Sequence, residues 1–176
     1  MTSVIASLIF GGDWQLKTFI DEISNSLHYT ISKGDIRSDE GILVRMHVTN
    51  TFQDLLGIEP KRQNQISDSM NQISEEGRGV LVLLNFSNQT NSKEDKNSNT
   101  LRRYGIGAQI LRECNIRKMR LLTNNPRKII GLEEGYGLKI TKREPIEIES
   151  NCVNDSYLRT KREKLGHFLS MDTDEE

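Results

Sequence analysis

The alternation of apolar and polar residues predicts short β-strands over the first fifty residues of the chain. In Leu27–Ser32 every second residue is apolar, which places one row of side chains on a single face of a strand. Residues typical of turns, such as Lys33-Gly34-Asp35, separate the apolar segments. The strands predicted in this part of the chain are Gln15–Ile20, Leu27–Ser32 and Ile42–Val48.

A helical period replaces the strand pattern in the middle of the chain. Ile66, Met70 and Ile73 recur at spacings of three and four residues, and Gly77 suits the end of a helix over Gln65–Glu76. Strands and helices alternate after this point, which predicts an α+β domain with a mixed β-sheet and flanking helices. The other predicted elements are the strands Val80–Leu84, Lys118–Leu122 and Leu138–Thr141 and the helices Leu101–Glu113, Asn125–Leu132 and Asp155–Leu165.

The chain of 176 residues is long enough for one domain with a hydrophobic core, which we place at residues 1–171. The polar run 85–100 has almost nothing to bury and is predicted to be a mobile surface loop. An acidic tail follows at 172–176. The basic stretch Tyr157–Lys164 is predicted to be a solvated helix face, with an acidic partner as the alternative.

The 24 basic and 25 acidic residues leave a net charge of −1, so no overall field favours nucleic acid or a membrane surface. Only Cys114 and Cys152 are present, without CxxC spacing, and both are predicted to be buried thiols. The apolar segment Val4–Phe10 is too short for a membrane span. We therefore expect a cytoplasmic protein.

The clearest local candidate for ligand binding lies between a predicted strand and a predicted helix. Thr123-Asn124-Asn125-Pro126-Arg127-Lys128 would place unpaired backbone N–H groups, a hydroxyl and two cations around one point. Such a helix start favours an anion such as a phosphate. The same residues also suit an ordinary helix cap, so this pattern alone leaves both interpretations open.

Several segments together resemble the GTP cyclohydrolase II family. They include LRRYGIGAQILRECNIRKMRLLTNNPRKIIG at 101–131, YLRTKREKLGH at 157–167 and ILVRMH at 42–47, and the resemblance runs from about Leu8 to Leu169. It implies a nucleotide-binding fold in riboflavin biosynthesis, typically a homodimer and often fused behind dihydroxybutanone phosphate synthase. By the same resemblance, Arg45, Gln65, Thr123 and Lys128 match positions that contact the nucleotide, and Arg102 matches the nucleophile.

The sequence departs from the family where the family binds zinc. There, Ser-Glu-Cys and a later Cys-Asp-Cys supply three thiolate ligands, which leave one position open for an activated water. Here Val48-Thr49-Asn50 and Ile58–Gln63 stand at those places. His47, Asp54 and Glu59 are an alternative ligand set, beside a rigid and cationic Pro-Lys-Arg. We expect no zinc and no other cofactor.

Two further departures concern the family's catalytic loop and its base. The polar run 85–100 stands where the family has Gln-Glu-Gly-Arg-Gly-Ile-Gly-Leu, and Thr100 stands at the position of the proton acceptor. A threonine hydroxyl is not a general base near neutral pH. The favoured hypothesis is therefore a domain without hydrolytic activity that acts as a structural or regulatory module. The alternatives are an active hydrolase on GTP or another phosphorylated substrate, and a nucleotide or phosphate sensor.

Overall fold

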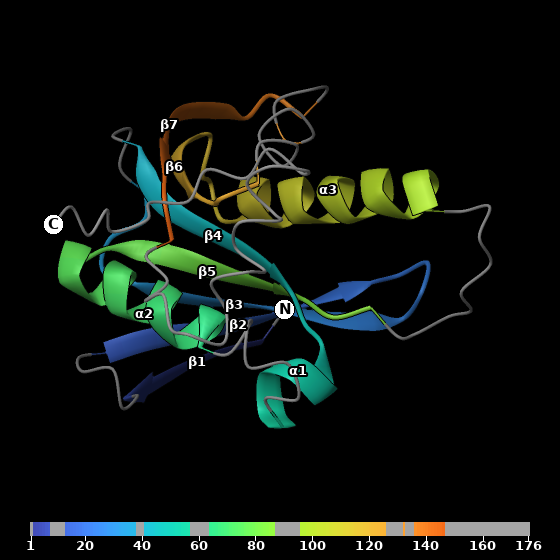
Figure 1. Ribbon diagram of the computed structural model, residues 1–176, viewed down its shortest axis with the longest axis horizontal. Coiled ribbons are helices and arrows are strands. Elements are labelled where there is room, and N and C mark those ends of the chain that lie inside the picture. Colours follow the sequence, from blue (N-terminus) through green and yellow to red (C-terminus); the bar gives the residue numbers. More distant parts are fainter. Residues whose placement is uncertain are drawn as a thin grey trace, which may run out of the picture.

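The computed structural model describes residues 2–7, 13–37, 41–56, 64–86, 96–125, 132 and 136–146, and it confirms the predicted α+β fold with a mixed sheet (Figure 1). Seven strands form one sheet in the order β1-β2-β3-β5-β4-β6-β7. The strands are β1 Thr2–Ser7, β2 Asp13–Asp21, β3 Ser26–Lys33, β4 Ile42–Val48, β5 Gly79–Leu84, β6 Lys118–Leu122 and β7 Lys139–Glu144. The helices are α1 Thr51–Leu56, α2 Gln65–Glu76 and α3 Lys96–Glu113.

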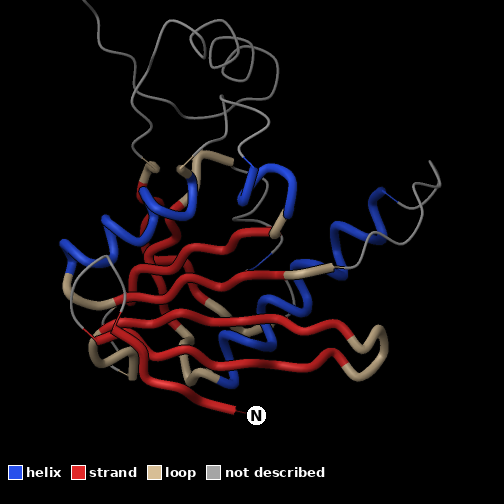
Figure 2. Tube along the Cα trace, turned by 90° about the horizontal axis from the view of Figure 1, so that it is seen from below, coloured by secondary structure: helices blue, strands red, loops and turns tan. Residues whose placement is uncertain are grey.

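The strand directions bring several chain segments to one edge of the sheet. β4 runs parallel to β5 and β6, and β7 runs parallel to β6. β3 is antiparallel to both β5 and β2, so β2 points the same way as β5. The carboxyl ends of β2, β4, β5, β6 and β7 therefore share one edge, which we call the carboxyl edge. Figure 2 shows the strands side by side in the sheet. In open sheets with parallel strands, this is where ligand sites form.

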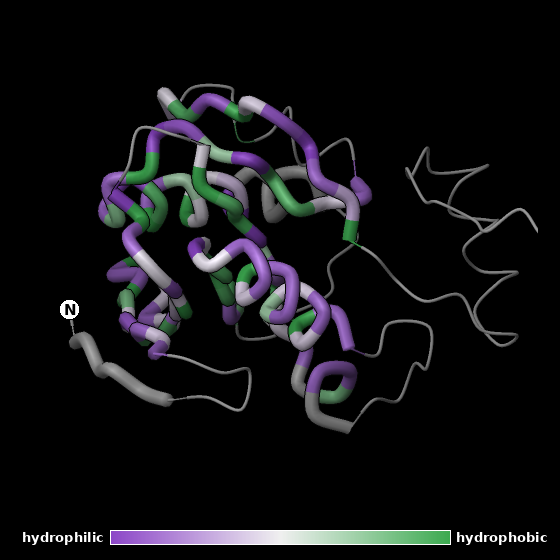
Figure 3. The backbone as a smooth tube through the Cα atoms, turned by 90° about the vertical axis from the view of Figure 1, so that its left-hand side faces the viewer, coloured by the Kyte–Doolittle hydropathy of each residue, from purple (hydrophilic) through white to green (hydrophobic). Residues whose placement is uncertain are grey.

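Two apolar layers cover the two faces of the sheet. α3 packs on one face over Val44, Met46 and Val82, and α2 packs on the other face over Leu43 and Leu81. Apolar and polar stretches alternate along the elements, as expected for strands and helices that each bury one side (Figure 3). Consecutive residues of β4 thus point to opposite faces of the sheet, so the position of a residue along β4 determines the layer that its side chain joins.

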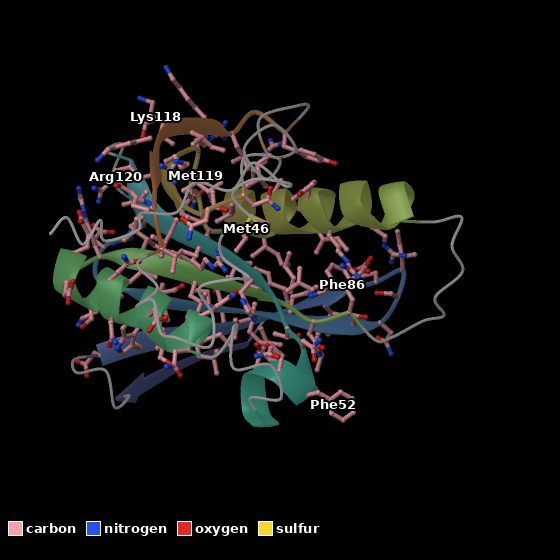
Figure 4. All side chains as sticks on the ribbon, in the orientation of Figure 1. Met46, Phe52, Phe86, Lys118, Met119 and Arg120 are labelled. Atoms are coloured by element: carbon pink, nitrogen blue, oxygen red, sulfur yellow. The ribbon has the colours of Figure 1, made fainter. Side chains whose placement is uncertain are left out.

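The close approach of α3 to β4 depends on a glycine. A Cβ atom at Gly107 would overlap Met46 Cε, and the Met46 side chain lies beneath α3 (Figure 4). No helix in the described part of the chain is long and apolar enough to cross a membrane. Cys114 is a buried free thiol, as predicted, and Cys152 lies outside the described residues.

Most predicted elements are present with small shifts at their ends, but α3 begins at Lys96. The last five residues of the segment 85–100, predicted to be a loop, are therefore helical. They are polar and give no apolar period, so the pattern could not reveal them. β1 and α1 were not predicted. The predicted helix at 155–165, the tail at 172–176 and most of the predicted helix at 125–132 lie outside the described residues.

Candidate functional site

A buried arginine lies at the centre of the carboxyl edge. Arg45 of β4 points to the α2 side of the sheet and is only 5% exposed. Its Nη1 donates a hydrogen bond to the Leu122 carbonyl oxygen at 3.1 Å, and its Nη2 donates to Gln65 Oε1 at 3.3 Å. Burial lowers the pKa of Arg45 to about 10, so the guanidinium remains charged near neutral pH.

This charge has no counter-ion among the described residues. None of their carboxylates forms an ion pair with Arg45, and none of their atoms accepts a hydrogen bond from its Nε. Burying a charge is costly unless an opposite charge and hydrogen bonds compensate. Two neutral acceptors satisfy only part of the guanidinium, so the local chemistry suits an anion.

Thr123 follows directly after the carbonyl that Arg45 binds. Its backbone N–H donates to the Glu144 oxygen at 2.9 Å, and its hydroxyl accepts a hydrogen bond from the Asn125 N–H at 3.0 Å. The hydroxyl is thus part of a local turn at the end of β6. The structure brings Arg45, Gln65 and Thr123 to one place, whereas Lys128 lies outside the described residues.

Asn124 is a site-building residue that the sequence analysis missed. Its Nδ2 donates to the Ile146 oxygen and its Oδ1 accepts from the Ile146 N–H, both at 3.1 Å. The side-chain amide thus reproduces the pairing of a β-ladder and joins the ends of β6 and β7. Only the position of Ile146 reveals this role, because the sequence pattern around Thr123 indicates a cap.

Arg102 is part of α3, on the other side of the sheet from Arg45. Its Nη2 is 2.8 Å from Asp21 Oδ2 at the end of β2. The hydrogen bond from Ser24 and the Arg102 guanidinium lower the pKa of Asp21. The structure therefore does not bring Arg102 to Arg45. Thr100, at the position of the family's proton acceptor, lies in α3.

Four residues at the end of β4 and in α1 form a hydrogen-bonded group. His47 Nε2 lies 3.1 and 3.0 Å from the two oxygens of Asp54 in α1. The Asn50 N–H donates to Asp54 Oδ2 at 2.7 Å, and Asn50 Oδ1 accepts from the Gln53 N–H at 3.2 Å. Asn50 thus caps α1 with its side chain.

These residues do not fit a zinc ion. Asn50 occupies the position that the resemblance assigns to a cysteine ligand, but it offers an amide oxygen already used in the helix cap. His47 and Asp54 are bonded to each other, and no three His, Cys, Asp or Glu side chains of the described segments gather as a metal site. The alternative ligand Glu59 lies outside the described residues.

Several curated proteins that are similar to the chain are named riboflavin biosynthesis protein RibBA. The riboflavin biosynthesis protein RibBA of Chlorobium phaeovibrioides is 40% identical, with 90% of this chain and 44% of that protein covered. RibBA of Bacillus subtilis is 38% identical, with 90% and 45% covered. The chain thus spans less than half the length of these curated relatives.

A solved structure shows the same fold. The crystal structure of RibBX, a two-domain 3,4-dihydroxy-2-butanone 4-phosphate synthase from A. baumannii, matches with a TM-score of 0.57 at 19% identity. The match covers 85% of this chain and 40% of that one. The model of the family described as GTP cyclohydrolase II matches residues 5–145. The chain belongs to the GTP cyclohydrolase II family.

Proposed function

We propose that this GTP cyclohydrolase II-like domain functions in riboflavin biosynthesis in the cytoplasm without zinc-dependent hydrolysis of GTP, as a structural or regulatory module. Its relatives named RibBA support the pathway. The observation that carries the loss of hydrolysis is Asn50, whose side chain caps α1 at the position of a zinc ligand. Without a metal, the domain lacks the zinc-bound water that the family uses for hydrolysis.

A formate-release assay with GTP, run with and without added zinc, tests the proposal. We expect no formate from this chain under conditions in which a zinc-containing GTP cyclohydrolase II releases it. Metal analysis of the purified protein should find zinc far below one ion per chain. Zinc-dependent release of formate would refute the proposal and favour the alternative of an active hydrolase on GTP.

A variant that regains the family's three cysteines can be compared with the unmodified chain in the same assay. Lys61→Cys and Gln63→Cys place a Cys-x-Cys within the stretch Ile58–Gln63, where the family has its Cys-Asp-Cys. Combined with Asn50→Cys they should bind zinc, because three thiolates are a sufficient ligand set. We expect metal uptake without formate release, since Thr100 cannot act as the base. Comparing metal uptake with formate release shows whether the missing zinc ligands alone or also the missing base prevent hydrolysis.

A second candidate function is the binding of a nucleotide or phosphate as a signal. The buried Arg45, which lacks a carboxylate partner among the described residues, favours it. Calorimetry with GTP, pyrophosphate and ribulose 5-phosphate should detect binding of at least one. Arg45→Met should abolish that binding, and Arg37→Met, on an exposed side chain, should not. No heat from any of the three ligands would exclude this function.

We also propose that the domain works beside a dihydroxybutanone phosphate synthase domain, fused or separate, and forms a homodimer. The length of the relatives supports a further domain, and the two-domain RibBX supports its identity. Light scattering on the purified chain tests the dimer, since a monomer mass over the whole concentration range would refute it.

A further inference from the structure

A histidine of β3 is buried beside the end of β5. His28 is 1% exposed, and its Nδ1 accepts a hydrogen bond from the Asn85 N–H at 3.1 Å. The β3–β5 ladder ends at the pair of Tyr29 and Leu83, so this bond lies beyond the last backbone pair. The imidazole therefore takes the place of a backbone acceptor and holds the end of β5 against β3.

The same bond determines which ring nitrogen carries the proton. A neutral imidazole has one donor and one acceptor nitrogen, so with Nδ1 as the acceptor the proton is on Nε2. Nε2 is buried, and no atom of the described segments accepts a hydrogen bond from it. A buried donor without an acceptor is unfavourable. The part of the chain that the structure describes thus holds His28 by one hydrogen bond rather than two.

Phe86 covers the imidazole on the α3 side. Its ring centroid lies 5.1 Å from that of His28, and the Arg103 guanidinium of α3 lies over the Phe86 ring at 5.3 Å (Figure 4). Phe86 is half-buried and Asn85 is exposed. Because the Asn85 N–H would meet water if it left His28, the end of β5 can separate from β3 without leaving a buried N–H unpaired.

The charges around His28 disfavour its protonated form. β2 contributes the Asp21 carboxylate and, further along the same face, Lys17, while α3 contributes Arg102 and Arg103. Asp21 is already paired with Arg102. Burial lowers the pKa of His28, and of the two nearest charges Asp21 raises it and Arg102 lowers it. An imidazolium at this place would be poorly compensated, so hydration would favour it.

We propose that protonation of His28 releases Asn85 and Phe86 from β3, so that this corner of the carboxyl edge opens in mild acid while the rest of the sheet stays folded. On protonation Nδ1 becomes a donor, and it can no longer accept the Asn85 N–H. Asn85 Oδ1 also accepts the Thr49 hydroxyl at 3.3 Å, and Thr49 directly precedes the Asn50 cap of α1. The opening therefore reaches the start of α1.

The uptake of one proton sets the size of the effect. In the open form, without the bond to Asn85, His28 is hydrated and its pKa returns towards the ordinary value of about 6.5. The pKa is lower in the closed form, so opening takes up a proton. The ratio of open to closed form should then rise about tenfold for each pH unit below about 6.5, until the closed form is protonated as well.

A pH titration of the full chain followed by NMR tests the proposal. We expect the amide signals of Asn85 and Phe86 to move with the same midpoint as the ring signals of His28, while circular dichroism still reports the native sheet. His28→Gln should remove this response, because its side-chain amide does not titrate in this range and its oxygen can accept the Asn85 N–H.

Three charge variants test the surroundings of His28. Arg102→Gln should raise the midpoint, because it removes a cation, and Asp21→Asn should lower it, because it removes a carboxylate. Arg112→Gln, on an exposed side chain in the last turn of α3, is the control and should leave the midpoint unchanged.

Three results would overturn the proposal. They are protonation of His28 only together with loss of the native sheet, an Asn85 amide that does not follow the His28 titration, and a response that persists in His28→Gln. If His28→Gln does not fold, the midpoints of Arg102→Gln and Asp21→Asn decide, since a failure to shift in opposite directions would contradict the role of His28. None of these readouts uses GTP or zinc, so they are independent of the proposed function.

Discussion

Replacing Arg45 by methionine separates an anion-binding role from a structural one. Methionine replaces the aliphatic part of the arginine side chain and lacks the guanidinium that binds Leu122 and Gln65. If the guanidinium is present for a ligand, its removal should cost little stability and should abolish binding. If it holds the sheet together, its removal should destabilise the fold.

The structure gives the magnitude of the expected change in stability. Burial lowers the pKa of Arg45 to about 10, which corresponds to about 3 kcal/mol against the charged form. Two charge-assisted hydrogen bonds offset about 3–6 kcal/mol. The two terms differ by about 0–3 kcal/mol, so we expect the unfolding free energy of Arg45→Met to stay within about 3 kcal/mol of wild type. For a domain of this size that is a Tm change of less than about 12 °C.

Thermal unfolding with and without ligand measures both effects. A ligand at a hundred times its Kd should add about 2.7 kcal/mol to the wild-type protein and nothing to Arg45→Met. Arg37→Met is the control and should respond like wild type, since Arg37 is exposed and paired with Asp35. The reasoning is refuted if Arg45→Met retains the ligand response or loses clearly more than about 3 kcal/mol.

Three further predictions concern stability. Gly107→Ala should lower the unfolding free energy by about 1–3 kcal/mol in urea unfolding, because the new methyl group overlaps Met46, and Met46→Ala in the same chain should recover part of it. Asn124→Ala should cost about 2 kcal/mol by calorimetry, since it leaves the Ile146 N–H and oxygen unpaired, and Asn124→Asp should keep only the contact to the N–H. Burial lowers the pKa of His28, so the unfolded chain takes up a proton that the folded chain resists, and stability should fall as pH drops below about 6.5. His28→Gln should flatten this part of the pH profile, and an unchanged slope would contradict the assignment.

Elements with a strong hydrophobic period were predictable, and those without one were not. β4, α2 and β6 have the predicted bounds, because each buries a regular apolar row. α1 was missed since it has only six residues and depends on the cap from Asn50 and the contact of Asp54 with His47. These contacts are visible only once β4 ends beside them.

The site was predictable in part, and chiefly through the resemblance. Arg45, Gln65 and Thr123 lie together, as expected of residues that would contact one ligand. The amide pairing of Asn124 with Ile146 joins residues 22 apart and could not be inferred from local pattern. The position of Arg102 depends on the face to which α3 packs, which the sequence does not specify.

Arg45 and Arg102, which the resemblance assigns to one site, lie on opposite faces of the sheet. This separation limits how hydrolytic activity could be regained. Arg102 would reach Arg45 only by leaving the carboxylate of Asp21, which is largely shielded from solvent, without its guanidinium partner. It would also bring a second cation towards one that already lacks a counter-ion among the described residues, and like charges repel more strongly in a buried environment. An anionic ligand between them would relieve the repulsion but not replace the pairing of Asp21. Cysteines at 50, 61 and 63 should therefore recover the metal without turnover, and Asp21→Asn added to them should release Arg102 without supplying a base.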